Sequence, residues 1–273
     1  MMRRWSWLAE LVVGLVLFEA VRRTLIATGN PNLVPSLILL GSAIVPVAFV
    51  DFMAQRRLRF GVDGGTIGLV ALFGGVIGVV AAGTLEYDTL RDLGFVPLVA
   101  VGLIEEAAKL VVPAVLILAM RRHVGPADGL VVGVASGAGF AVLETMGYAF
   151  VTLIQSGGDL AAVDGVLLLR GLLSPAAHMA WTGLAAAALW NAAANGRRPR
   201  LLGRFVAVYL LVVALHAAWD SFDGLVGYTL VAAISLGLLA FTTWRLGERA
   251  PHGGPAARTT GRREAAALRS LER

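Results

Sequence analysis

Apolar stretches of about 20 residues recur along the chain, and they constrain its fold more than any other feature. A helix rises about 1.5 Å per residue, so such a stretch crosses the roughly 30 Å hydrocarbon core of a bilayer. The stretches lie at 5–21, 33–50, 66–83, 95–120, 129–154, 165–190, 203–222 and 224–244. They predict an all-α fold, a polytopic transmembrane helix bundle of about eight spans. The last two stretches almost adjoin, and only residues 221–224 remain for a turn between them, so seven spans is the alternative.

The composition excludes most classes of water-soluble protein. Of the 273 residues, 58% are hydrophobic and 15% are charged, whereas about a quarter of a soluble protein is charged. The mean hydropathy is +0.78. The net charge of +5 comes from arginines grouped beside apolar stretches, a pattern typical of membrane topology. We therefore expect the lipid bilayer, and no nucleic acid, as a partner. The chain has no cysteine, which excludes disulfides, thiolate ligands and a cysteine nucleophile.

The arginine clusters predict the orientation of the bundle, because loops rich in basic residues face the cytoplasm. With the N-terminus inside, the cytoplasmic side holds Arg3, Arg4, Arg56, Arg57, Arg59, Arg121, Arg122, Arg197, Arg198, Arg200, Arg204 and the arginines from 245 onward. The acidic residues of the loops expected outside are Glu86, Asp88, Asp92, Asp159 and Asp164. We expect an N-in, C-in bundle over residues 1–244 and a disordered cytoplasmic tail over 245–273.

Ionisable side chains interrupt four successive apolar stretches, where each charge costs at least about 2.5–3.5 kcal/mol. They are Glu105, Glu106, Lys109, Glu144, Arg170, His178, His216 and Asp220. Their expected depths fall in one slab of the membrane, so these side chains are predicted to meet. Glu10 and Glu19 in the first stretch are instead expected to reach the interface or to pair with Arg22 and Arg23, without a part in chemistry.

Helical spacing relates several of these residues to one another. Glu105 and Lys109 are four residues apart and can pair on one face, whereas Glu106 points about 100° away. His216 and Asp220 are also four residues apart and share a face.

Two further features concern the helices themselves. Glu144 lies nearly on the face of Gly129, Gly133 and Gly137, a stripe of small residues that favours close helix packing. Pro175 cannot donate a backbone hydrogen bond, so it loosens the helix just before His178.

The chemistry of this set suits hydrolysis. Carboxylates beside imidazoles in a partly dry cavity can activate water and return a proton to a leaving amine. Two histidines and one carboxylate with an open position also form a known type of catalytic zinc site. The familiar H-E-x-x-H zinc motif is absent from the chain.

Four motifs, in order on successive stretches, resemble the PrsW family of intramembrane proteases, distant relatives of the CAAX-type prenyl endopeptidases. The motifs are E-E-x-x-K at Glu105, Glu106 and Lys109, F-x-x-x-E at Phe140 to Glu144, P-x-x-H-x-x-W-T-G around His178, and H-x-x-x-D at His216 to Asp220. The resemblance covers residues 95–222, the expected protease-like core. CAAX-type enzymes carry F-x-x-x-H where this chain has Glu144, which speaks against prenylated substrates.

The resemblance implies a multi-pass protease of the bacterial cell membrane, whose best-known substrate is a membrane-anchored anti-sigma factor. It implies Glu105, Glu106 and His178 as the catalytic core, with Glu144, His216 and Asp220 assisting. We accordingly expect the chain to hydrolyse a peptide bond in or near the membrane segment of a single-pass protein.

Within that reaction, Glu106 or Glu105 is the expected general base, oriented by Lys109, and Arg170 assists. His178 either polarises the carbonyl or binds a zinc ion together with His216 and Glu144. Members of the family are usually labelled metalloproteases, while the CAAX relatives have been argued to use glutamate, so both mechanisms stay open.

Two other classes of function compete with proteolysis. Buried carboxylates also serve as proton relays in transporters and channels, but no pair of matching halves with broken helices is found in the sequence. A non-catalytic scaffold is the third hypothesis.

Overall fold

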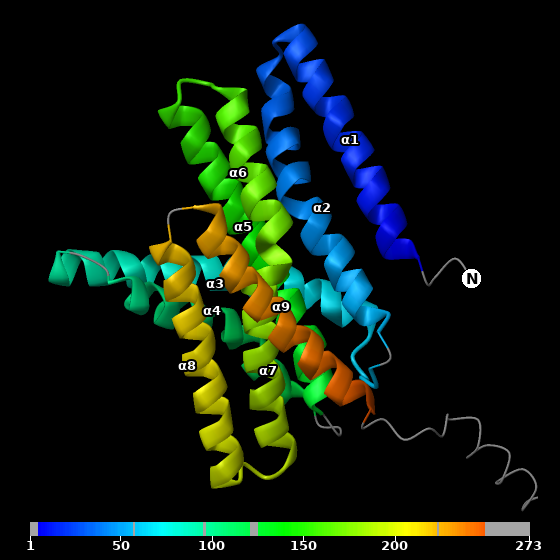
Figure 1. Cartoon of the computed structure of the whole chain (residues 1–273), viewed down its shortest axis with the longest axis vertical. Coiled ribbons are helices and arrows are strands. Elements are labelled where there is room, and N and C mark those ends of the chain that lie inside the picture. The colour runs from blue at the N-terminus through cyan, green and yellow to red at the C-terminus, as the bar shows by residue number, and fades with distance from the viewer. Residues whose placement is uncertain (1–4, 57, 95–96, 121–124, 223, 249–273) are drawn as a thin grey trace, which may run out of the picture.

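The computed structural model describes residues 5–56, 58–94, 97–120, 125–222 and 224–248. Every regular element among them is helical. They are α1 Ser6–Thr28, η2 Pro31–Leu33, α2 Val34–Ala54, α3 Gly64–Leu93, α4 Leu98–Ala119, α5 Pro126–Gln155, α6 Leu160–Leu173, η3 Ser174–Ala176, α7 His178–Ala194, α8 Pro199–Ser221 and α9 Leu225–Glu248. The expected all-α fold is confirmed (Figure 1).

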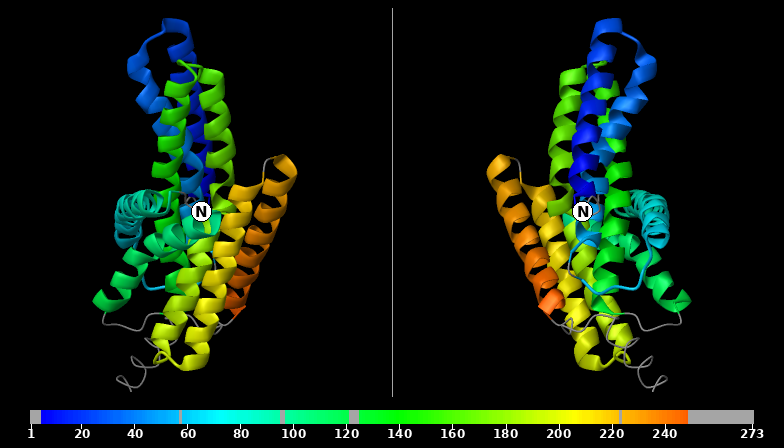
Figure 2. Two further views of the ribbon diagram at one scale, coloured as in Figure 1. Left: turned by 90° about the vertical axis from the view of Figure 1, so that its left-hand side faces the viewer. Right: turned by 90° about the vertical axis from the view of Figure 1, so that its right-hand side faces the viewer.

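The helix α5 forms the centre of the molecule and packs against α2, α3, α4, α6 and α7. Of its most apolar 18-residue window, 72% is buried, whereas no other candidate span exceeds 33%. Most helices run along the long axis of the molecule, but α3 lies across it (Figures 1 and 2). The molecule is therefore not a bundle of uniformly aligned helices.

Six described segments are long and apolar enough to cross a membrane, which confirms a multi-pass membrane protein. They are Pro31–Ala54, Gly64–Leu93, Pro126–Gln155, Leu160–Ala194, Pro199–Ser221 and Leu225–Glu248. The other two long helices, α1 and α4, carry several charged residues each. Those of α4 are Glu105, Glu106 and Lys109, which we expect in the site. The count of eight spans and the N-in, C-in orientation remain predictions.

Several expected boundaries are wrong, and α1, for example, runs to Thr28, seven residues beyond the expected end. The stretch expected over 165–190 is two helices, because η3 separates α6 from α7 at Pro175. As a result His178 becomes the first residue of α7. The helix α3 runs to Leu93, ten residues beyond the expected end, so Glu86, Asp88 and Asp92 lie in a helix rather than in a loop. Asp164, also expected in a loop, lies in α6. The tail expected over 245–273 lies outside the described residues beyond Glu248, where α9 ends.

Glycines set the close contacts of α5. A Cβ added to Gly129, Gly133 or Gly137 would collide with α7 at the carbonyl oxygens of Ala186, Thr182 and His178 respectively. The small-residue stripe predicted from the sequence therefore lies against α7. Glu144 lies two turns beyond Gly137 on nearly the same face, so this packing brings its carboxylate to His178.

The crossing of α3 over α5 depends on Gly139, and we expect Gly139→Ala to destabilise the fold by about 1–3 kcal/mol. Its Cβ would collide with the backbone carbonyl of Ala71, which cannot move without shifting α3. Thermal unfolding in detergent measures the effect. Gly83→Ala on α3 is the control, because its Cβ would meet no atom within 4 Å. Equal melting temperatures for both variants would contradict the tight crossing.

Candidate active site

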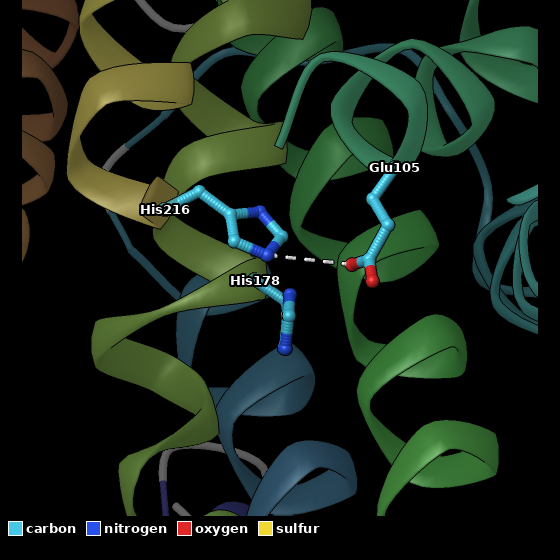
Figure 3. A group of neighbouring side chains, drawn as sticks. All are labelled: Glu105, His178 and His216. Atoms are coloured by element: carbon cyan, nitrogen blue, oxygen red, sulfur yellow. Dashed lines mark ion pairs between the residues drawn. The ribbon is translucent and has the colours of Figure 1, made fainter. Parts of the chain in front are cut away.

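The ionisable residues of four helices meet beside the break between α6 and α7. Glu105, Glu106 and Lys109 come from α4, Glu144 from α5, His178 from α7 and His216 from α8. Figure 3 shows Glu105, His178 and His216 directed toward one another from their three helices. The convergence predicted from the sequence is therefore present in the structure.

Lys109 lies at the centre of this cluster and is fully buried. Its ammonium donates to Glu105 Oε2 at 3.0 Å and to Glu106 Oε1 at 2.8 Å. The expectation that Glu106 points away from Lys109 is wrong, because the three-residue spacing also lets the long lysine side chain reach it. The same ammonium lies 2.8 Å from His178 Nδ1. One cation thus holds both carboxylates and an imidazole.

His178 continues this chain of contacts toward the opposite side. Because an ammonium has no acceptor, His178 Nδ1 must accept from Lys109, which leaves the hydrogen on Nε2. Nε2 lies 2.9 Å from Glu144 Oε2, and that oxygen lies 2.7 Å from Arg170 Nη2. The guanidinium of Arg170 also stacks on Tyr148, with Cζ 3.9 Å from the ring centroid. Glu144 is therefore held from both sides.

His216 connects the second carboxylate of α4 to α8. Its Nδ1 lies 2.9 Å from Glu106 Oε1, and its Nε2 lies 3.4 Å from Asp220 Oδ2 and 3.6 Å from Glu105 Oε2. The predicted pairing of His216 with Asp220 is confirmed. The ring of Trp181 stacks on the imidazole at a centroid distance of 5.0 Å, which fixes its orientation among three carboxylates.

The second carboxylate oxygen of Glu106 is buried and has no hydrogen-bond partner among the described residues. Glu106 is fully buried, and while its Oε1 binds Lys109, its Oε2 is unpaired. Such an atom costs free energy unless water or a ligand satisfies it. A cavity of about 10 Å³ lies beside His178, close to the smallest volume that holds one water molecule. The site therefore has an unsatisfied carboxylate oxygen on Glu106 and, beside His178, Arg170 and Trp219, a separate cavity about the size of one water molecule.

Three of these residues could bind a metal ion. Glu105, His178 and His216 each offer one ligand atom, and these atoms lie within 4.8 Å of one another. Two imidazoles and one carboxylate are the donor types of a catalytic zinc site. In this structure the ammonium of Lys109 contacts two of the three residues, Glu105 and His178, so it would have to move aside for an ion to bind. The group contains Glu105 where the sequence analysis expects Glu144. The carboxylate of Glu144 instead contacts Arg170 and His178 Nε2.

Glu86 is a site residue that the sequence analysis missed. On α3, Ala82 packs with Ala108 and Phe140, and Glu86 follows one turn later on the same face. Its charge interacts with those of Glu105 and Glu144. Its Oε1 is buried and unpaired among the described residues. Helical spacing would have placed Glu86 in the site only if the helix expected over 66–83 had been extended past residue 83.

The comparison with protein families agrees with this geometry. The model of the PrsW family intramembrane metalloproteases matches residues 60–246, a range that contains every residue of the cluster. This match confirms the resemblance seen in the four motifs, and it does not favour the transporter hypothesis. No curated protein and no solved structure matches the chain.

Proposed function

Because the chain belongs to the PrsW family of intramembrane metalloproteases, we propose that it cuts single-pass proteins of a bacterial cell membrane in or beside their membrane segment. A membrane-anchored anti-sigma factor is the proposed natural substrate. The family makes the chain a peptide-bond hydrolase with a membrane protein as substrate. The observation that supports the proposed chemistry is the unpaired, buried Oε2 of Glu106 amid two imidazoles and an ammonium.

Glu106 acts as the general base. Its Oε1 is held by Lys109 and His216, so the carboxylate cannot rotate freely, and Oε2 is left to accept a proton from water. The hydroxide adds to the scissile carbonyl carbon, and the proton passes from Glu106 to the leaving amine. The products are one new carboxylate and one new amine, which balances the addition of one water.

The remaining residues orient this base and stabilise charge. Lys109 fixes both carboxylates of α4, and its positive charge stabilises the negative charge that develops on the substrate oxygen. His178 contacts Lys109 through Nδ1 and Glu144 through Nε2, so it polarises the carbonyl once the substrate displaces one of these partners. When a zinc ion is bound, Glu105, His178 and His216 would hold it, and it would supply Lewis-acid polarisation of the carbonyl.

Reconstitution of the purified full-length chain in liposomes with a single-pass reporter protein tests this function. We expect two reporter fragments, with a new amino terminus in or next to the membrane segment when they are analysed by mass spectrometry. Proton flux into the same liposomes serves as the second measurement. Flux that depends on the site glutamates, with an intact reporter, would support a transporter and overturn the proposal.

Arg170 is a positioning residue in this scheme, and we expect Arg170→Gln to lower kcat by about 10- to 100-fold. Without the guanidinium, Glu144 loses the ion pair that holds it against His178. Arg170→Lys should recover part of the loss, because it restores the charge. Arg22→Gln is the matched control, since Arg22 pairs with Asp164 away from the site. A kcat for Arg170→Gln equal to that of the control would refute the role.

A further inference from the structure

A second feature of the molecule lies on the other side of α5 from the catalytic cluster. A groove of about 610 Å³ runs between α2, α3 and α5, and its α5 wall includes Val142 and Met146. Helical spacing places these two residues on the face opposite Glu144. Its walls are almost wholly apolar, as suits a ligand with an apolar body.

The α3 wall of this groove includes two glycines, Gly64 and Gly68, beside Ile67, Ala71 and Leu72. A Cβ added to Gly64 or Gly68 would meet no atom within 4 Å. Elsewhere on the same helix, a Cβ at Gly74 or Gly75 would collide with α5. Because small residues four apart allow two helix backbones to approach closely in a membrane, the Gly64–Gly68 stripe provides space for one more helix.

One end of the groove is acidic. Glu10 of α1 and Asp51 of α2 both line it, and their like charges interact. Asp51 accepts hydrogen bonds from Ser6 and Gln55, which are neutral. Glu10 makes no ion pair with any described residue, whereas Glu19 on the same helix pairs with two arginines. Ionisable residues within membrane proteins commonly pair with an opposite charge or mark a binding site, so the exposed Glu10 is available to a cationic partner.

We infer that this groove binds the transmembrane helix of the single-pass substrate, with a flanking lysine or arginine of the substrate placed at Glu10 and Asp51. The inference rests on the proposed function. Cytoplasmic flanks of membrane helices carry an excess of lysine and arginine, and the acidic end lies where α1 begins and α2 ends, on the side expected to be cytoplasmic. Charge and shape at this site therefore both complement a basic-flanked helix.

Filling the groove tests the docking of a helix. Gly68→Leu introduces a side chain into open space, so the variant should fold, and we expect its KM for the single-pass reporter to rise by at least about tenfold with a smaller change in kcat. Gly83→Leu is the matched control, because it lies on the same helix, has equally open space and is outside the groove. Equal KM values for the two variants would overturn the inference.

Exchanging charges tests the acidic end independently. With a reporter whose cytoplasmic flank carries lysines, Glu10→Lys should raise KM, and a reporter with glutamates in that flank should reverse the loss. If Gly68→Leu displaces co-purified lipid while KM stays unchanged in both Gly68→Leu and Glu10→Lys, the groove is a lipid site and the inference is wrong. In every case the parent chain still cleaves the reporter, so a failed groove is distinguishable from a failed proteolytic function.

Discussion

Replacing Glu106 by glutamine is expected to lower kcat/KM for a single-pass reporter by about 10²- to 10⁴-fold, the range typical of a lost general base. Glutamine has the same shape as glutamate, and its amide oxygen still accepts a hydrogen bond from Lys109. It cannot take a proton from water. The loss should therefore appear in kcat, with KM nearly unchanged.

The interpretation requires that the variant folds, because Glu106 belongs to a buried ion pair. Breaking such a pair by removing one charge costs about 3–5 kcal/mol in general. In this site Lys109 retains Glu105 as a second anionic partner at 3.0 Å, so a smaller loss of stability is expected. Melting temperatures in detergent, measured on the same preparations as the kinetics, separate loss of fold from loss of the base.

Glu19→Gln is the matched control for this substitution. Glu19 is also a glutamate of a long apolar helix that pairs with cations, here Arg22 and Arg23, but it lies on α1 away from the cluster. Its variant should retain the activity of the parent. If Glu106→Gln folds and cleaves at the rate of Glu19→Gln, the general base is another group, and Glu105 is then the next residue to test.

Local spacing predicted much of this site. The pairs Glu105 with Lys109 and His216 with Asp220 follow from four-residue separations on a helix, which do not depend on the rest of the fold. The glycine stripe that carries Glu144 to α7 was likewise visible, since it requires only helical periodicity. Apolar length predicted the helices themselves.

The contacts that local spacing could not supply depend on how helices cross. Glu86 joins the site only because α3 lies across α5 and extends to Leu93. Glu105 takes the place of Glu144 in the possible metal group, and Arg170, from another helix, pairs with Glu144. Both outcomes depend on the rotation and crossing of packed helices, which single-chain periodicity does not specify.

Zinc binding is expected to depend on Glu105 and to survive the loss of Glu144. We expect Glu105→Gln and His178→Asn to weaken zinc binding by more than about 100-fold, because each removes one of three ligand atoms that lie within 4.8 Å of one another. Glu144→Gln removes only a group that orients His178, and such outer partners typically contribute about 10- to 100-fold. Competition with a coloured chelator, on full-length protein in detergent at one pH, measures each affinity.

Each pattern of affinities leads to a different ligand set. If Glu144→Gln loses zinc as completely as His178→Asn while Glu105→Gln keeps it, the set expected from the sequence is correct, and the grouping of Glu105 with the two histidines is wrong. Glu19→Gln again serves as the control, with the affinity of the parent. If the parent chain cleaves its reporter at full rate without binding zinc, all three ligand roles fail. Glu106 and Lys109 then remain as the catalytic pair, because their contacts require no ion.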